Sequence, residues 1–393
     1  MTSTLIQDLA AQLDARARDH LLRRRRPVAT WHGVEAVVDG RTMVCFCTND
    51  YLGFAHEPAI AEAAARAARD WGSGAAASRL IAGDYGLIRL LEDRLAAWKG
   101  AEAVLVLPSG YMANLAAVSA LCGKDDTVVL DKLAHASLVD GARLARARIR
   151  VFPHNDVGRL EDILRARTAG RVLVATESVF SMDGDTAPLA AIADVCDRHG
   201  AALLVDEAHA LGVYGEGRGC VAAAGIAGRV AVTVGTLSKA LGSQGGFVAG
   251  ARPLIEHLVN TARPFIYSTG LAPASAGAAL AALDELEAGS SRVTRLWTNV
   301  GRLRGLIEGV AVPGDGPICP VITGSAASAM ELAGLLGDAG FLAPAVRPPA
   351  VPRNRARVRV TVSAAHAAAQ IDTFAQALHA ALAQMMQQGT TYD

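Results

Sequence analysis

One lysine, Lys239, lies among small, hydroxylic and glycine residues in the stretch GTLSKALGSQGGFVAG, residues 235–250. The residues before it, AVTV at 231–234, have the apolar character of a buried strand, and the stretch contains no carboxylate to pair with the ammonium group. A lysine becomes nucleophilic when burial or neighbouring cations lower its pKa. Glycines such as Gly245 and Gly246 permit close approach of another backbone or a ligand. Lys239 is therefore either a surface lysine on a turn or a lysine that forms a Schiff base.

An acidic residue follows another apolar run. Asp206 comes directly after AALLV (201–205), and His209 lies three residues further along the chain. Taken alone, Asp206 is compatible with a helix cap or a structural salt bridge, and His209 with a satisfied polar side chain. The functional alternative is that Asp206 pairs with a protonated ring nitrogen of a cofactor and that His209 faces the same ligand.

Two further segments favour a cofactor pocket. PSGY (108–111) follows the apolar run AVLVL (103–107) and opens a helical stretch, where free backbone N–H groups and a glycine can hold a phosphate. His135 follows the run TVVL (127–130) and supplies a flat ring for stacking. Each signal is weak alone. Together, a Schiff-base lysine, a strand-end aspartate, a phosphate-binding turn and a stacking ring predict a site for pyridoxal 5′-phosphate (PLP).

These positions share one place in the predicted fold, the carboxyl ends of short apolar strands. The predicted strands are AVLVL (103–107), TVVL (127–130), RIRVF (148–152), RVLVAT (171–176), AALLV (201–205) and VAVTV (230–234). Because these runs alternate with helical patterns, they predict an α/β fold with a mostly parallel sheet covered on both faces. Ligands of such sheets bind beyond the carboxyl ends of the strands, so the polar residues there are expected to converge.

The chain of 393 residues is long enough for more than one domain. Residues 1–26 resemble an amphipathic helix that ends in four arginines and is stopped by Pro27, and long Ala/Leu-rich helical stretches dominate after about residue 276. The later strands are PVIT (320–323) and RVRVTV (357–362). We therefore expect an N-terminal arm at 1–48, a large PLP-binding domain at 49–276 and a smaller α+β domain at 277–393.

The composition argues against several classes of protein. Lys+Arg and Asp+Glu both number 38, which disfavours a nucleic-acid binder or a membrane-surface protein. The only close cysteine pair, in CFC at 45–47, lacks a second pair for a zinc site, so we expect reduced thiols and no metal. The N-terminus has no apolar signal core, and the uncharged run 264–283 contains prolines, glycines and hydroxyl residues. We expect a soluble cytoplasmic protein.

Along nearly its whole length the chain resembles the α-oxoamine synthases, PLP-dependent enzymes of the aspartate-aminotransferase-like fold (fold type I). RPP at 347–349 with VP at 351–352, and the arginines before Pro27, indicate the oxononanoate branch of that family. The other matching stretches are NDYLG (49–53), GSGAAASRLIAGDY (72–85), SGYMANL (109–115), LAHASLVDGARL (133–144), HND (154–156), SVFSMDGDTAPL (178–189), DEAHALGVYGEGRG (206–219), TLSKALGSQGG (236–246) and FIYSTGLAP (265–273).

The resemblance implies a role for each residue around the cofactor. Lys239 would hold PLP as a Schiff base and later move the substrate α-proton, while Asp206 would keep the pyridine nitrogen protonated. His135 would stack on the ring, and His209 and Ser181 would lie near its phenolic oxygen. Two further groups would surround the ring and phosphate, namely Gly110, Tyr111 and Thr236 of the same chain and Ser268 and Thr269 of the other subunit. A homodimer is thereby implied.

The resemblance also implies substrates, L-alanine and pimeloyl-CoA or pimeloyl-acyl-carrier protein, joined in a decarboxylative condensation. Arg347 would hold the substrate carboxylate, and Arg23 would contact the acyl substrate, although a solvated basic turn is an equal alternative for Arg23. Ala350 stands where the family usually has Thr, and Ala210 where Gly is commoner. A lost hydroxyl removes a hydrogen bond of roughly 0.5–1.5 kcal/mol, which affects the acyl substrate or its affinity rather than the chemistry.

Three alternatives remain open at the level of the sequence. The first is another α-oxoamine synthase, of the glycine C-acetyltransferase or 5-aminolevulinate synthase type. The second is an aminotransferase on the same fold. The third is a non-catalytic protein of this fold, which the presence of Lys239, Asp206 and His209 disfavours.

Overall fold

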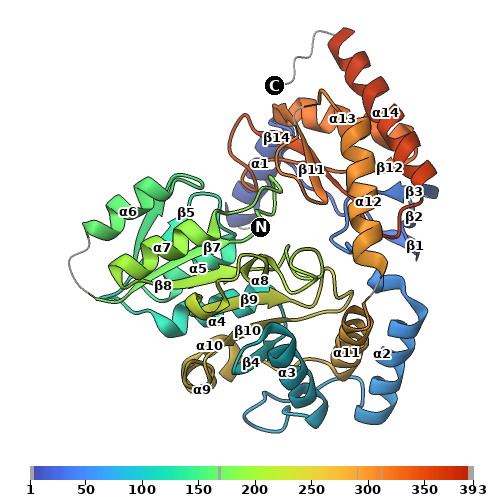
Figure 1. The fold of residues 1–393 in the computed structure, drawn as a ribbon. Helices are drawn as coiled ribbons and strands as arrows, with labels where there is room; N and C mark the ends of the chain where they lie inside the picture. Colours follow the sequence, from blue (N-terminus) through green and yellow to red (C-terminus); the bar gives the residue numbers. More distant parts are fainter. Residues whose placement is uncertain (1–3, 167–169, 290, 311, 388–393) are drawn as a thin grey trace. The chain divides into compact units, whose positions relative to one another are not determined.

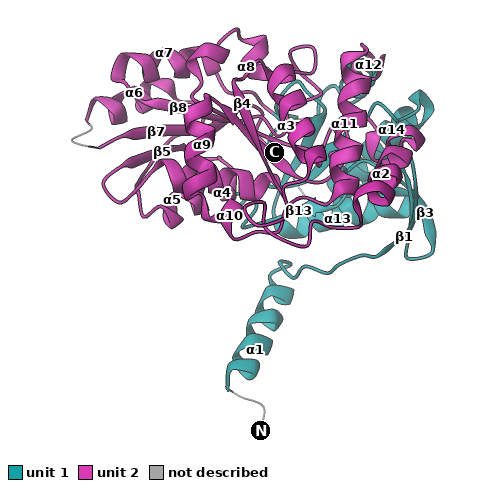
Figure 2. Ribbon diagram, turned by 90° about the horizontal axis from the view of Figure 1, so that it is seen from below, with its two compact units in different colours: residues 1–48, 182–184, 295–393 teal, residues 49–181, 185–294 magenta. Residues whose placement is uncertain are grey.

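The computed structural model describes residues 4–166, 170–289, 291–310 and 312–387 (Figure 1). The chain divides into two compact units, which we call unit 1 (1–48, 182–184 and 295–393) and unit 2 (49–181 and 185–294) (Figure 2). Within unit 2, α11 (Pro273–Glu287) packs against α2 (Pro58–Trp71). The domain ranges 1–48, 49–276 and 277–393 stay a prediction, and their ends at 1–3 and 388–393 lie outside the described residues.

Unit 2 is built on a seven-stranded sheet with the order β4-β10-β9-β8-β7-β5-β6. Five strands run parallel in register, while β10 is antiparallel to both of its neighbours, β4 and β9. The strands are β4 (Ala103–Leu107), β5 (Thr127–Asp131), β6 (Arg148–Phe152), β7 (Val172–Glu177), β8 (Ala202–Asp206), β9 (Val232–Thr236) and β10 (Gly246–Gly250). The predicted α/β fold and all six predicted strands are confirmed. The glycine-flanked strand β10 was not among them.

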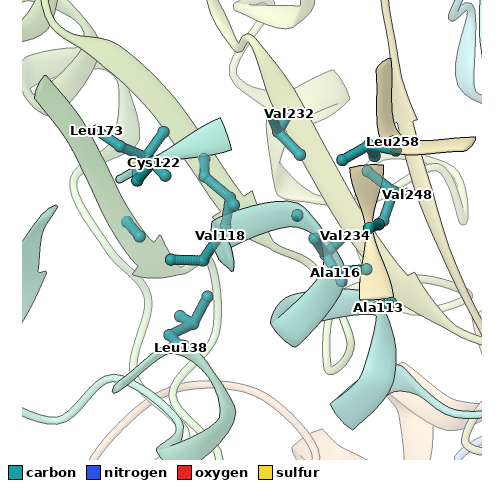
Figure 3. Packing of buried hydrophobic residues seen from close by; sticks show 14 of the residues in the cluster. Ala113, Ala116, Val118, Cys122, Leu138, Leu173, Val232, Val234, Val248 and Leu258 are labelled. Carbon is teal, nitrogen blue, oxygen red and sulfur yellow. The ribbon is translucent and has the colours of Figure 1, made fainter. Parts of the chain in front are cut away.

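Helices cover both faces of this sheet, and each face has its own hydrophobic core. Val128 and Leu130 of β5 face one core, whereas Val129 between them faces the other, as the period of two in a strand requires. Figure 3 shows the first core, where Ala113, Ala116 and Val118 of α4 lie among side chains of the sheet. This core takes side chains from α4 (Gly110–Leu121), α5 (Ala136–Leu144), α9 (Arg252–Thr261) and α10 (Arg263–Ile266), and the other from α6 (Val157–Arg165), α7 (Leu189–His199) and α8 (Cys220–Ala223).

The other described elements of unit 2 are α3 (Gly86–Lys99) and the short 3₁₀ helices η1 (Phe54–His56) and η2 (Ala227–Arg229). The division between the units falls inside α12 (Ser291–Leu306).

Unit 1 contains two small sheets, with the orders β1-β2-β3-β12 and β11-β14-β13. The predicted N-terminal helix is present as α1 (Thr4–Arg18), but it ends before the four arginines. The predicted strands at 320–323 and 357–362 are present as β11 (Ile318–Gly324) and β14 (Ala356–Thr361). The remaining elements are β1 (Val28–His32), β2 (Glu35–Val38), β3 (Arg41–Cys45), β12 (Phe341–Leu342), β13 (Ala345–Val346), α13 (Ala326–Asp338) and α14 (Ala368–Gln387).

No helix within the described ranges is long and apolar enough to cross a membrane.

Candidate active site

Lys239 lies in the turn that joins β9 to β10 and is half-buried. Its Nζ is 2.9 Å from Nε2 of His209, and Nδ1 of the same imidazole is 2.6 Å from the hydroxyl of Tyr51. His209 and Tyr51 are both buried. The turns after β8 and β9 thus bring two of the predicted residues into contact, and Tyr51 completes a line of three polar groups.

Asp206 ends β8 and is buried, with 5% of its surface exposed. Its Oδ2 accepts a hydrogen bond from Nδ2 of Asn114 (2.6 Å), and its Oδ1 accepts one from the backbone N–H of Ala208 (2.9 Å). No ion pair joins Asp206 to a lysine or arginine among the residues that the structure describes. A buried carboxylate that accepts hydrogen bonds but forms no ion pair within the described part of the chain suits a protonated ligand nitrogen.

His135 is the N-cap residue of α5, and its Nδ1 faces Ser137. This nitrogen lies 2.7 Å from Oγ of Ser137 and accepts a hydrogen bond from the backbone N–H of Ser137 at 3.3 Å. Burial lowers the pKa of His135; the charge of Asp206 opposes this shift and the charge of Lys239 reinforces it. The ring of His135 meets the ring of Tyr111 edge-on, with centroids 6.2 Å apart. An uncharged imidazole is therefore favoured at this position.

Glu177 ends β7 directly beside Asp206, its partner in the parallel register of β7 and β8. Its Oε2 accepts a hydrogen bond from the backbone N–H of Ser181 (3.2 Å), whereas its Oε1 has no hydrogen-bond partner among the described residues. Burial, and then the charge of Asp206, raise the pKa of Glu177 well above its ordinary value. The protonated form of this acid is thereby favoured.

The start of α4 forms the remaining part of the site. Ser109 caps the helix through Oγ, which accepts from the backbone N–H of Met112 (3.2 Å). A Cβ atom on Gly246 would lie 2.5 Å from the backbone N and Cα of Gly110, and a Cβ on Gly110 would lie 3.3 Å from Thr236. The close backbone approach expected at Gly246 is present, and the backbone that approaches is the first turn of α4.

Four other predicted residues lie near these elements. Thr236 donates a hydrogen bond from Oγ1 to the carbonyl of Gly245 (2.9 Å), and the Tyr111 hydroxyl donates to Asp140. The hydroxyl of Ser268 is 4.0 Å from Sδ of Met112 on α4 of the same chain. Thr269 forms an isolated antiparallel bridge with Ser78. Their contact with a phosphate, from either subunit, stays a prediction.

Arg23, Arg347 and Ala350 all belong to unit 1. The Arg23 guanidinium donates to the carbonyls of Arg347 (3.4 Å) and Pro348 (3.1 Å), and the Arg347 guanidinium donates to the carbonyls of His20 and Leu22. Burial, together with the charge of Arg23, lowers the pKa of Arg347. The two guanidinium groups thus meet backbone carbonyls, and neither pairs with a carboxylate among the described residues. Such a pair of cations suits an anionic ligand.

Sequence reasoning singled out neither Tyr51 nor Asn114, Ser137 or Glu177. A signal existed for each, because all four lie in or beside stretches that resemble the α-oxoamine synthases. Their partners could not be read from the sequence, since the hydrogen bonds join residues as far as 158 positions apart.

The residues of unit 2 fit PLP. Lys239 has the amine that a Schiff base with this cofactor requires, and Asp206 is a buried acid that forms no ion pair within the described residues. Oδ1 of Asn114 is a further buried oxygen without a hydrogen-bond partner among the described residues. The start of α4, which Gly246 approaches closely, is a helix N-terminus of the kind that binds phosphates through backbone N–H groups. For comparison, no group of three or more possible metal ligands occurs in the described part of the chain.

Known proteins resemble the chain over nearly its full length. A family model described as aminotransferase class I and II matches residues 41–378. The chain is 47% identical over 381 residues to an 8-amino-7-oxononanoate synthase of Anaeromyxobacter dehalogenans (strain 2CP-1 / ATCC BAA-258), which covers 95% of each protein. It is 45% identical to the protein of that name from Azoarcus sp. (strain BH72), over 96% of this chain and 98% of the relative.

Solved structures also resemble the chain over nearly its full length. A serine palmitoyltransferase from S. paucimobilis, solved with a bound PLP–myriocin aldimine, matches with a TM-score of 0.93 and 31% identity, over 98% of this chain and 99% of that one. An 8-amino-7-oxononanoate synthase from Francisella tularensis matches with a TM-score of 0.75 and 26% identity, over 88% and 98% of the two chains. The cofactor of this chain is PLP. The chain therefore belongs to the aminotransferase class I and II family and, within it, to the α-oxoamine synthases, which are PLP-dependent acyltransferases of fold type I.

Proposed function

We propose that the chain catalyses the decarboxylative condensation of L-alanine with a pimeloyl thioester to give 8-amino-7-oxononanoate, a step of biotin biosynthesis. The relatives of that name, 47% identical over 95% of the chain, support the substrates. The observation that carries the chemistry is the contact of Lys239 with His209 at the same sheet edge as the buried Asp206. When bound, PLP supplies an electron sink that stabilises negative charge on the substrate α-carbon.

Lys239 would hold the cofactor through Nζ, and its amine would take the substrate α-proton and return it. Its hydrogen bond to Nε2 of His209 fixes the position of Nζ at the end of a flexible side chain. Tyr51 in turn holds the imidazole from the opposite nitrogen. A proton-transfer group must lie within hydrogen-bond reach of the atom it serves. By holding Nζ in place, His209 and Tyr51 therefore affect the rate at which Lys239 transfers the proton.

Asp206 keeps the cofactor ring nitrogen protonated, because a buried anion favours a positive charge beside it. His135 would stack on the cofactor ring as a neutral imidazole, and His209 and Ser181 would contact its phenolic oxygen. Glu177 accepts a hydrogen bond from the backbone N–H of Ser181.

Gly110, Tyr111 and Thr236 surround the phosphate at the start of α4, where the helix dipole favours an anion. Ser268 and Thr269 reach the phosphate from the other subunit of a homodimer.

Arg347 holds the substrate carboxylate, and Arg23 contacts the acyl chain's terminal carboxylate or its carrier. Holding the carboxylate would orient the substrate α-carbon for the chemistry that PLP supplies. The carrier is coenzyme A or acyl-carrier protein, and the reaction takes place in the cytoplasm.

A panel of amino acids and acyl thioesters, followed by thiol release, tests the proposal. We expect L-alanine with pimeloyl-CoA or pimeloyl-acyl-carrier protein to give the highest kcat/KM, and the Lys239→Ala variant to lose both turnover and the covalent link to PLP. A preference for glycine, or for serine with palmitoyl-CoA, would replace the proposed substrates but keep the family. Turnover by Lys239→Ala at the wild-type rate would refute the role of the lysine.

A further inference from the structure

A line of hydrogen bonds joins Asp206 to His135 through two side chains that have no assigned role. Nδ2 of Asn114 lies 2.6 Å from Oδ2 of Asp206 and 2.9 Å from Oγ of Ser137. Oγ of Ser137 lies 2.7 Å from Nδ1 of His135. Asn114 and Ser137 are buried, with 2% and 0% of their surfaces exposed, so water does not compete for these bonds.

The donors and acceptors along this line can be assigned. The amide of Asn114 has two N–H groups, and these go to Asp206 and to Ser137. Because Oγ of Ser137 accepts from Asn114, its own hydrogen is left to donate to Nδ1 of His135. The backbone N–H of Ser137 is directed at the same nitrogen. Nδ1 is therefore an acceptor, and the ring proton of a neutral His135 lies on Nε2.

We propose that Asn114 and Ser137 are positioning residues that couple Asp206 to His135, holding the imidazole as its Nε2–H tautomer and the Asp206 carboxylate in one orientation. The inference rests on the proposed roles of Asp206 and His135 toward PLP. Two donors on Nδ1 stabilise the neutral ring, in agreement with the lowered pKa of His135. An uncharged ring adds no positive charge beside the cofactor, so it does not oppose the protonation that Asp206 favours.

The packing of α4 against α5 makes this coupling possible. A Cβ on Gly141 of α5 would lie 2.9 Å from Cβ of Val118 and 3.4 Å from the carbonyl oxygen of Asn114 on α4. The glycine lets the two helices approach closely at the level where Asn114 reaches Ser137. The positions of both side chains are thus fixed by the backbone as well as by their hydrogen bonds.

The first test reads the tautomer directly, in the apoenzyme and in the holoenzyme. In protein labelled with ¹⁵N at histidine, the signal lost in His135→Gln identifies His135, and its two-bond couplings show which ring nitrogen carries the proton. We expect Nε2–H in the wild type and a mixture of tautomers in Ser137→Ala. The matched control is Ser178→Ala, because Ser178 is equally buried but donates to the carbonyl of Asp206 (3.2 Å). A wild-type signal in Ser137→Ala, or an equal change in the control, would overturn the proposal.

The second test measures the dissociation constant of PLP against pH. Loss of one donor on Nδ1 should raise the pKa of His135. The acid limb of the binding curve, that is the pH below which PLP affinity falls, should therefore move up by roughly half to one pH unit in Ser137→Ala. PLP affinity near neutral pH should fall about two- to tenfold. Asn114→Ala and Ser137→Ala should be non-additive, because both break the same line of bonds. Additive losses with an unmoved acid limb would show a merely structural role.

The two proposals can fail separately. If Asp206→Ala bound PLP as tightly as the wild type, the proposed role of Asp206 would be wrong. The hydrogen bonds of Asn114 and Ser137 would then not support PLP binding through Asp206, even if His135 were the Nε2–H tautomer. If Asp206→Ala lost PLP while Ser137→Ala changed neither the tautomer nor the acid limb, only the coupling would be wrong.

Discussion

Two acids, Glu177 and Asp206, end neighbouring strands, and their hydrogen-bonding surroundings differ. Asp206 accepts hydrogen bonds from an amide and a backbone N–H. Glu177 accepts only the Ser181 N–H among the described hydrogen bonds and lies beside the charge of Asp206, so burial favours its neutral form. A buried carboxyl group beside a negative charge is costly to ionise, so these surroundings favour a neutral Glu177.

Glu177→Gln tests this asymmetry. Since glutamine resembles a protonated glutamate, PLP affinity should stay within about threefold of the wild type. The pKa of Glu177 is raised on folding, so its contribution to stability is present below the ordinary value of 4.5 and is lost as pH rises through the folded pKa. The variant should therefore gain stability over the wild type between pH 5 and pH 8, measured as the urea midpoint. A relative loss over that range would mean that an ionised Glu177 stabilises the fold.

At the scale of elements, the site depends on how closely β10 and α4 approach. β10 runs antiparallel between β4 and β9, and its first residue, Gly246, lies against the first turn of α4. The neighbouring strand β9 leads directly to Lys239. One glycine thus allows the proposed phosphate site and the lysine turn to lie on adjacent elements.

Gly246→Ala should disturb this arrangement. The new Cβ would lie 2.5 Å from the backbone of Gly110, which cannot rotate away as a side chain could. We expect a stability loss of about 1–3 kcal/mol, as in other overpacked cores, and PLP binding weakened about tenfold or more. Urea unfolding and PLP titration measure the two effects. Gly228→Ala is the control, because a Cβ there meets nothing within 4 Å. Equal behaviour of the two variants would contradict the packing argument.

At the scale of the whole molecule, the chain forms two compact units, and a histidine is buried in one of them. In unit 1, the ring of Phe46 stacks on His366 with centroids 4.1 Å apart and on Phe374 at the same distance. Nε2 of His366 lies 3.0 Å from the carbonyl of Cys45, and its Nδ1 accepts from the backbone N–H of Ser363 (2.9 Å). Burial lowers the pKa of His366 to about 4, so the folded protein keeps this histidine neutral.

Acid should therefore weaken unit 1 through His366. A histidine whose pKa is depressed on folding contributes stability above its ordinary pKa of 6.5, and this contribution is lost as pH falls toward 4. The full loss is about 3 kcal/mol. We expect His366→Asn to be less stable than the wild type at pH 7 but to lose less of its stability between pH 7 and pH 4.5 in urea unfolding. Parallel pH profiles would exclude His366 as the cause.

The sequence alone determined the six strands of the large sheet other than β10, the residues at their carboxyl ends and the cofactor, because apolar runs and strand ends are local patterns in the chain. Lys239, Asp206 and His209 could be named from such patterns. Only the tertiary structure decided their partners: Asn114 meets Asp206 across 92 positions and Tyr51 meets His209 across 158. It also decided the antiparallel β10, whose two glycine ends gave a weak strand signal. These contacts depend on how closely helices and strands pack, especially at Gly141 and Gly246. A local sequence pattern does not predict which distant backbone segment will pack against a glycine.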